Sequence, residues 1–455
     1  MIGGGSLRAC RIAFVVAILM PTLAGSAGLL TWGMWSRPKP PPAEAWPSML
    51  ESLWGGVIRV DRIEPQGPQQ ATLVGVTLVD PTTGATRAWL PQVVACRTGG
   101  AWALSTDLLI LDCEQLLATA EDCLALRHAI TPSRVLPPSD WELMAHRVVL
   151  QAGPFQQTFQ QAAISVARKT DNQPEARLKV VAFAAEQDLA EPPLRLEWER
   201  RHDEGGFSSA GRLTTGAASV ACRAIASLCP WARRLGTACE FHGDWAWSQV
   251  GPERKDDFTG ELVNVDLDAL ISEQFPHRLS GIARVQIERA TLQQGRLSAL
   301  KGAIAAEGGV LSASLLGAAA EHLKLASPQA LIESPPAAAI PFERLYVSFD
   351  LKGAQLALRG HADPNDSGVL LAAAGRPLLA APADHGVPAV ALLRLLVPPA
   401  EYQVPATRQT ATLVRLLPVP DAPATQAGRH TPTRLAPAAA VETTATPPVR
   451  APGLR

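Results

Sequence analysis

A histidine and a carboxylate lie two residues apart in the segment CEFHGDWAW, where His242 and Asp244 stand among aromatic residues. An imidazole beside a carboxylate can carry out acid–base chemistry, and an indole face can hold a sugar ring. The same pattern also describes a strand with a bend at Gly243 and tryptophans that pack inward. The segment therefore leaves two alternatives, a catalytic site and a structural strand, and we favour the strand.

A second polar group lies in the segment FPHRLSG, which contains His277 and Arg278. Arginine matches the geometry of a phosphate group because its planar guanidinium donates two parallel hydrogen bonds. Arg278 is therefore a candidate contact for the headgroup of a phospholipid. The alternative is a plain loop that leads into a strand beginning at Ile282.

The cysteines give no metal motif. Cys10 lies near the amino terminus, and the other six could pair as disulfides in an oxidising compartment or remain buried thiols. Six cysteines allow 15 pairings, and the sequence does not choose among them. No C-x-x-C pair or zinc-ligand spacing occurs, and the nucleophile-elbow, phosphate-loop, metalloprotease, calcium-loop and dinucleotide motifs are missing. We therefore predict a non-enzymatic protein without metal or cofactor.

The charge balance excludes binding to a polyanion. The 455 residues include 41 Lys and Arg against 42 Asp and Glu, which gives a formal net charge of -1 and no general positive field. We therefore expect no nucleic-acid partner. Only 18% of the residues are charged, and 39 prolines outnumber 35 glycines, which favours short elements joined by many turns.

The amino terminus carries an uncharged apolar stretch between Arg11 and Arg37, long enough to cross a membrane as a helix. Its small residues around Gly25 also fit a cleavable secretory signal, and a buried core helix is a third alternative. We favour an uncleaved anchor over residues 1–36, because apolar residues resume after Ala27. Either an anchor or a signal would export the rest of the chain.

Proline-rich segments flank the central part of the chain. Residues 37–48 predict an extended spacer, and residues 418–455, which are rich in Ala, Pro and Thr, predict a disordered tail that could meet an envelope or cell-wall partner. Between them we expect a β-rich domain over residues 49–205 and a second β-rich domain with helices over residues 206–417.

Strict alternation of apolar and polar residues predicts that the central part is mainly β. We expect an α+β fold in which an antiparallel sheet forms a groove or a packed layer, with a few helices packed on it. The segments RLYVSFDLK, LRLEWERR and ARVQIER each present one apolar and one polar face. Hairpins are expected over residues 72–94, 279–309 and 344–359, the second with a further break at Gly302 before a third strand. Helical spacing of apolar residues predicts helices that could cover part of the apolar sheet face, over residues 114–130, 220–235, 268–275 and 311–323.

The anchor, the LVGVTLVDPTTG hairpin and the run FTGELVNVDLDALISEQFPHRLSGIARVQIERATLQQGRLSALKGAIAAEGG resemble the AsmA-like group of envelope proteins. The FPH-x-L-x-G phrase also resembles large exported proteins of planctomycete-type bacteria. The chain is short for a groove that must bridge two membranes, and its tail replaces an obvious second anchor.

The resemblance implies a single-pass inner-membrane protein with its bulk on the periplasmic side and an apolar groove that binds or transports membrane lipids, or supports envelope assembly. The residues expected to contact lipid are Val285, Ile287, Leu345, Val347, Phe349 and Leu351, with Arg278 at the headgroup. The alternative is a structural scaffold in which the same side chains face a closed core.

Overall fold

The computed structural model describes residues 57–67, 69–98, 101–124, 140–169, 175–203, 206–363, 366–382 and 386–396. The predicted anchor, spacer and tail lie outside these residues. Every described residue belongs to the first unit of the chain, Met1–Pro418. The fold below is that of the first unit.

Within the described residues, twenty strands join one sheet. The strands are β1 (Val57–Pro65), β2 (Gln70–Val79), β3 (Thr86–Thr98), β4 (Ala101–Asp112), β5 (Trp141–Ala152), β6 (Phe155–Lys169), β7 (Glu175–Ala184), β8 (Leu194–Asp203), β9 (Gly206–Thr214), β10 (Val220–Ala221), β11 (Glu240–Val250), β12 (Glu253–Asp266), β13 (Leu279–Ser280), β14 (Ile282–Gln293), β15 (Arg296–Ser312), β16 (Ala339–Lys352), β17 (Gln355–Gly360), β18 (Val369–Ala373), β19 (Arg376–Ala380) and β20 (Gly386–Pro388). The mainly β fold predicted from the alternation is confirmed.

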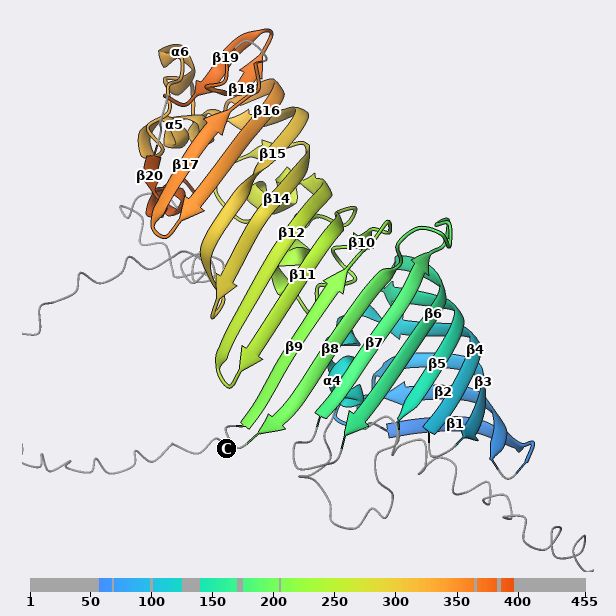
Figure 1. The fold of residues 1–455 in the computed structure, drawn as a ribbon. Helices are drawn as coiled ribbons and strands as arrows, with labels where there is room; N and C mark the ends of the chain where they lie inside the picture. The colour runs from blue at the N-terminus through green and yellow to red at the C-terminus, as the bar shows by residue number, and fades with distance from the viewer. Residues whose placement is uncertain are drawn as a thin grey trace, which may run out of the picture. The chain divides into compact units, whose positions relative to one another are not determined.

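The sheet is a meander in which most long strands pair antiparallel with the strand before them (Figure 1). One pair departs from the predicted antiparallel pattern, because β4 and β5 run parallel. A parallel pair needs a crossover connection. Here the connection begins with the short helices η2 (Cys113–Gln115) and α4 (Leu116–Cys123). The predicted division between residues 205 and 206 falls inside the β8–β9 hairpin, whose strands pair from Arg195↔Thr214 to Asp203↔Gly206.

An unbroken row of apolar residues crosses this sheet at right angles to the strands. Each member is the register partner of the next, over fifteen strands from β2 to β20. We call it the apolar row; its members are Ala71, Ala95, Leu104, Leu143, Ile164, Val180, Leu196, Leu213, Trp245, Phe258, Ala290, Leu300, Leu351, Leu356 and Val387. At roughly 4.8 Å between neighbouring strands, the row follows the sheet for roughly 65 Å.

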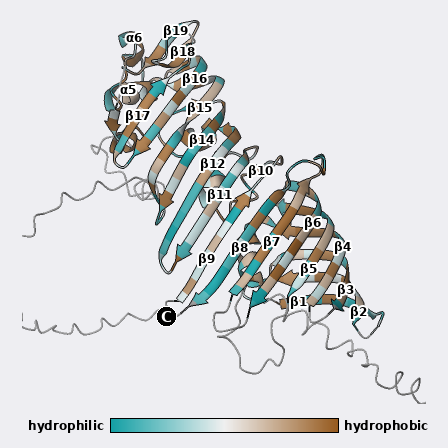
Figure 2. Cartoon of the chain, in the orientation of Figure 1, coloured by the Kyte–Doolittle hydropathy of each residue, from teal (hydrophilic) through white to brown (hydrophobic). Residues whose placement is uncertain are grey.

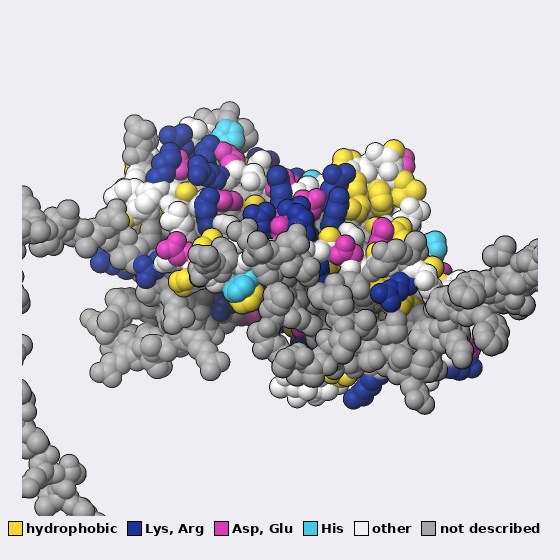
Figure 3. Space-filling view, turned by 60° about the horizontal axis from the view of Figure 1, so that its bottom comes forward, with side chains coloured by type: hydrophobic (Ala, Val, Ile, Leu, Met, Phe, Trp, Pro, Cys, Tyr) yellow, Lys and Arg dark blue, Asp and Glu magenta, His cyan; other side chains and the backbone are white. Residues whose placement is uncertain are grey.

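The two faces of the sheet differ in chemistry, as the alternation of colours along the strands in Figure 2 shows. The face with the apolar row, here called the inner face, carries most of the hydrophobic core. On the outer face, basic and acidic residues pair across strands, for example Arg177 with Glu199 at 3.2 Å and Arg284 with Glu261 at 3.0 Å. Figure 3 shows such basic and acidic side chains side by side. One polar face and one buried face are typical of an antiparallel sheet covered on one side.

Short helices cover parts of the inner face. They are η3 (Pro230–Leu235), η4 (Asp268–Ser272), α5 (Ala313–His322), α6 (Gln329–Ile332) and α7 (Val390–Leu396). Trp231 of η3 packs edge-on against Phe258 of the apolar row, with 5.8 Å between ring centroids. Ser312 caps α5 by accepting a hydrogen bond from the Leu315 N–H. The predicted helices over 114–130, 268–275 and 311–323 are thus present in shortened form, as far as the described residues show.

The helix predicted over residues 220–235 is wrong. Val220 and Ala221 form β10, which pairs with β11, and turns follow until η3 begins at Pro230. The helical spacing of apolar residues arises because these turns bury Ala224 and Ile225, and η3 buries Ala232. A proline in the second half of the segment removes a backbone donor that a continuous helix would need.

The predicted hairpins are confirmed at β2–β3, β14–β15 and β16–β17. At the first turn, the Asp80 carboxylate accepts hydrogen bonds from the N–H groups of Thr82 and Thr83. The predicted break at Gly302 does not occur, because β15 runs through it as one strand of 17 residues. This glycine marks a close approach between strands instead of a turn.

Candidate functional site

The six residues predicted to contact lipid lie together on the inner face, on β14 and β16. The strand between them, β15, joins the two sets through direct register partners, and Ile304 is paired with Val285 on one side and Val347 on the other. Two of the six, Ile287 and Leu351, are 9% and 2% exposed and belong to the buried core. The other four are half-buried.

Ile304 completes this group, although sequence reasoning did not select it. It lies in the segment KGAIAAEGG, whose small residues weaken the alternating pattern, and only the pairing of β15 with both neighbours shows its place. We call the half-buried side chains of Val285, Ile304, Leu345, Val347 and Phe349 the apolar seam. The seam is a continuous apolar patch across three adjacent strands.

The seam lies where two hydrophobic cores meet. Val285, Ile304 and Leu345 pack against the long core that follows the sheet, whereas Val347 and Phe349 pack against a second core. The second core includes Leu323 beside α5 and Ala391 of α7. Side chains at such a boundary keep part of their apolar surface uncovered by the chain itself. Covering that surface with acyl chains would gain about 0.8 kcal/mol for each buried methylene group.

Gly302 lies at the edge of the apolar seam, opposite Phe349. A Cβ atom at this position would lie 2.1 Å from the carbonyl oxygen of Gln286 and 3.1 Å from the ring of Phe349. The backbone of β15 therefore approaches β14 more closely than any side chain would allow, and the Phe349 ring lies over the glycine. Aromatic cover of a glycine on a neighbouring strand is a known device for stabilising sheets.

Arg278, the predicted headgroup contact, is exposed at the entrance to β13. Its backbone is fixed, because its N–H donates to the Ser312 hydroxyl at 3.0 Å and its carbonyl accepts from the Ser312 N–H at 2.9 Å. The neighbouring residue Leu279 pairs with Leu311, five residues along β15 from Ala306, the partner of Leu345. At ~3.3 Å per residue this separation is roughly 17 Å.

The His242 and Asp244 cluster forms part of a regular strand, β11, and the bend expected at Gly243 is instead an extended pairing of Gly243 with Gly260 of β12. Trp245 and its neighbour Trp247 pack inward, as expected. On the outer face, the Asp244 carboxylate accepts hydrogen bonds from the Thr214 hydroxyl at 2.6 Å and from the Arg212 guanidinium at 3.1 Å. The carboxylate is therefore engaged by β9 rather than directed at His242.

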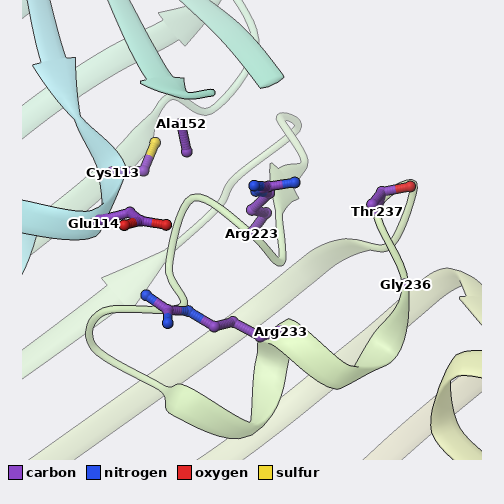
Figure 4. A pocket seen from close by; sticks show the side chains of 7 residues that line it. All are labelled: Cys113, Glu114, Ala152, Arg223, Arg233, Gly236 and Thr237. Atoms are coloured by element: carbon purple, nitrogen blue, oxygen red, sulfur yellow. The ribbon is translucent and has the colours of Figure 1, made fainter. Parts of the chain in front are cut away.

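A cavity of about 240 Å³ lies between η2 and the segment that joins β10 to β11. Figure 4 shows two arginines, Arg223 and Arg233, reaching toward it from that segment, with Glu114 and Cys113 on the η2 side. Burial raises the pKa of the Cys113 thiol to about 12, so this sulfur is protonated at neutral pH. Two guanidinium groups and one carboxylate give the cavity a local positive excess. No sequence motif predicted it, because its lining comes from segments about 100 residues apart.

A second hollow, of about 470 Å³, is lined by residues of the outer face of β14–β16 and by their neighbours. Its polar lining includes Arg284, Arg344, Tyr346 and His361, and the rings of the last two are 6.0 Å apart at a steep angle. Arg284 is already paired with Glu261. The hollow also has apolar lining, and one of its lining residues, Leu345, belongs to the apolar seam.

No group of three or more His, Cys, Asp or Glu side chains among the described residues could hold a metal ion. None of the described helices has the length and apolar character needed to span a bilayer.

Comparison of the chain with protein-family models, with curated proteins and with solved structures found no match.

Proposed function

We propose that this chain is a non-enzymatic, membrane-anchored envelope protein that binds lipid acyl chains on the inner face of its sheet, and so takes part in lipid transport or envelope assembly. The observation that carries the proposal is the apolar seam, five half-buried apolar side chains in adjacent positions at the boundary between two cores. A continuous, partly exposed apolar patch on one face of a sheet is suited to an extended apolar ligand.

The position of Arg278 supports a phospholipid as the ligand. The separation of roughly 17 Å along β15 between the Arg278 end and the Leu345 position is close to half of the ~30 Å hydrocarbon thickness of a bilayer, which is the reach of one acyl chain. An acyl chain lying along β15 from the seam would therefore bring its phosphate to the level of Arg278, whose side chain is exposed. A guanidinium can hold that phosphate with two parallel hydrogen bonds.

The membrane setting of the proposal comes from the sequence. The uncharged stretch between Arg11 and Arg37 would anchor the chain in the inner membrane as a single span, and the proline-rich segment after it would separate the sheet from the bilayer surface. The β-rich part would then lie on the periplasmic side. The tail from residue 418 would be available to an envelope or cell-wall partner.

The test is lipid carried by the purified full chain. After extraction in mild detergent, we expect mass spectrometry to detect phospholipid bound to the wild-type chain and much less bound to Val347→Asp, which places a carboxylate beside Ile304 in the seam. Ser348→Asp is the matched control, because Ser348 is the next residue on the same strand and pairs with Arg359 on the outer face. Absence of lipid from the wild-type chain, together with failure of a lipophilic probe to bind, would show the proposal to be wrong.

A structural scaffold with a closed core is the second candidate function. It is favoured by the apolar row, of which all members except Val180, Leu196 and Leu300 are buried by the chain itself. In that case Val347→Asp would lower the stability of the chain, and neither it nor the wild-type chain would carry lipid.

A further inference from the structure

Cys222 and Cys239 lie directly opposite each other on paired backbone segments. The ladder between β10 and β11 pairs Ala221 with Glu240, and the next step of the same register brings Cys222 opposite Cys239. The Cys222 N–H donates to the Cys239 carbonyl at 2.8 Å, so the ladder continues through the pair. Their Sγ atoms are 2.8 Å apart and buried.

This arrangement places two free thiols at the backbone spacing of a cross-strand disulfide. Directly opposed residues at a hydrogen-bonded position of an antiparallel pair have Cα atoms about 5.5 Å apart, within the ~4.4 to 6.8 Å that disulfides span. The observed sulfur separation is only about 0.8 Å longer than the ~2.0 Å of a bonded pair. We propose that Cys222 and Cys239 form a disulfide in the mature protein.

The oxidant for this step would be a small disulfide such as oxidised glutathione. One protein thiolate attacks a sulfur of the oxidant, which forms a mixed disulfide and releases the first glutathione thiolate. The second protein thiolate then attacks the protein sulfur of the mixed disulfide and releases the second glutathione thiolate. The two cysteines lose two electrons and two protons, and the oxidant gains them as two thiols.

Burial decides when this exchange takes place. Cys222 and Cys239 are 0% and 1% exposed, so the native fold shields both sulfurs from an external thiol or disulfide. The bond would therefore form while the segment is still open during folding, and the folded protein would then protect it. Such a bond requires an oxidising compartment, which an exported protein would meet. It does not depend on the lipid-binding proposal.

The disulfide would close a loop that carries much of the lining of the 240 Å³ cavity beside η2. Arg223, Arg233, Gly236 and Thr237 line that cavity, and all four lie between the two cysteines. The same loop holds Trp231 against Phe258 on β12. One covalent bond would therefore fix both the wall of the cavity and the cover over the centre of the sheet.

The test is disulfide mapping of the full chain after it refolds from denaturant in mixtures of reduced and oxidised glutathione, followed by acid quenching and alkylation of the unfolded chain with N-ethylmaleimide. Trypsin cleaves after Arg212, Arg223, Arg234 and Arg254, and thus places Cys222, Cys229 and Cys239 on three different peptides. We expect peptide 213–223 to be linked to peptide 235–254, with the link lost after reduction. Cys229→Ala should keep this link, and Cys222→Ala should leave Cys239 alkylated.

The proposal is overturned if both cysteines are alkylated at every glutathione ratio, or if either one is linked to the Cys229 peptide instead. A chain equilibrated in denaturant provides the reference, because links formed there reflect proximity along the sequence alone. We expect the Cys222–Cys239 link to be enriched in the folded chain relative to that reference. Equal proportions in the two samples would show that the fold does not select the pair.

Discussion

The ring of Phe349 on β16 lies over Gly302 on β15, with its Cζ atom 3.1 Å from the position that a glycine Cβ would occupy. The two residues are direct register partners, and on its other side Gly302 is paired with Ile287. The glycine therefore lets three strands approach closely at the edge of the apolar seam. The ring covers the backbone at Gly302, which has no side chain of its own to shield it.

Gly302→Ala should therefore destabilise the protein. The added methyl group would lie 2.1 Å from the Gln286 carbonyl oxygen, and a backbone atom of a paired strand cannot move aside as a flexible side chain can. We expect the free energy of unfolding to fall by about 1 to 3 kcal/mol, the usual cost of overpacking. Denaturant titration followed by circular dichroism measures the change.

Gly317→Ala is the matched control. Gly317 lies inside α5, and a Cβ atom there would meet nothing within 4 Å. Alanine is favoured over glycine in a helix interior by about 0.5 to 1 kcal/mol. The same substitution should thus raise stability in α5 and lower it in β15. A stabilising or neutral effect of Gly302→Ala would contradict the close approach described for β15.

The strands were predictable because period-two alternation directly reflects a sheet with one buried face. LRLEWERR and ARVQIER form β8 and β14. The segment at Val220 was not predictable, because its apolar residues have helical spacing while the chain turns back to pair Cys222 with Cys239. Such a pairing depends on a contact 17 residues away, which local periodicity does not record.

The apolar seam was predictable only in part, for a related reason. The side chains on β14 and β16 follow from alternation, but Ile304 joins them through register, and register depends on irregularities such as the shift between Ile287 and Arg289. A displacement of one residue turns every side chain to the other face. Sequence therefore indicates which side chains share a face within a strand, and the structure shows which meet across strands.

The Asp80 carboxylate should give the protein a specific dependence on acid. A hydrogen bond from Arg87, followed by those from Thr83 and Thr82, lowers the pKa of Asp80 to about 2 from its ordinary 3.8. A carboxylate whose pKa is lower in the folded chain than in the unfolded chain stabilises the fold at every pH above its unfolded-state pKa. This contribution is lost as the pH falls from about 4 to about 2. Thermal unfolding midpoints measured across this range should show the loss.

Asp80→Asn isolates this effect. Asparagine keeps an oxygen for the N–H groups of Thr82 and Thr83 but carries no charge for Arg87. We expect a lower midpoint than the wild-type chain at pH 7 and a smaller difference between the two at pH 2. Burial raises the pKa of Asp122, the other partner of Arg87, so the contribution of Asp122 to stability increases as the pH falls. The comparison of Asp80→Asn with the wild-type chain separates the two effects. An equal difference at both pH values would contradict the assignment.

Trp231 should be important for the cover over the centre of the sheet. Its half-buried ring packs against Phe258 at a steep angle, and the segment that joins β10 to β11, to which it belongs, carries four of the cavity residues. We expect Trp231→Ala to cost about 2 kcal/mol, less than a fully buried aromatic, and to increase the fluorescence of a dye that binds exposed apolar surface.

Trp89→Ala provides the comparison for Trp231→Ala. Trp89 lies on β3 and is 38% exposed, so its removal deletes a ring of the same size from a more open position. Its cost should be well under that of Trp231→Ala, with no increase in dye fluorescence. Equal behaviour of the two variants would mean that η3 does not protect the sheet.

A photoreactive amino acid at Val347 tests the seam directly. Val347 is half-buried on the inner face and pairs with Ile304, whereas the adjacent Ser348 pairs with Ala303 on the outer face. When the full chain in native membranes is illuminated, we expect a benzoyl-phenylalanine side chain at position 347 to form covalent adducts with phospholipid. Mass spectrometry of the purified chain identifies the adducts.

The same probe at position 348 is the control, because successive side chains on a strand point to opposite faces. Both positions lie on one strand and are at nearly the same distance from any membrane surface, so a difference between them reports the face and not the depth. Lipid adducts at 347 but not at 348 would support an acyl chain in the seam. Adducts at both positions would indicate contact with bulk lipid, and their absence at 347 would favour the closed core, because an occupied seam must bring acyl carbons within reach of that side chain.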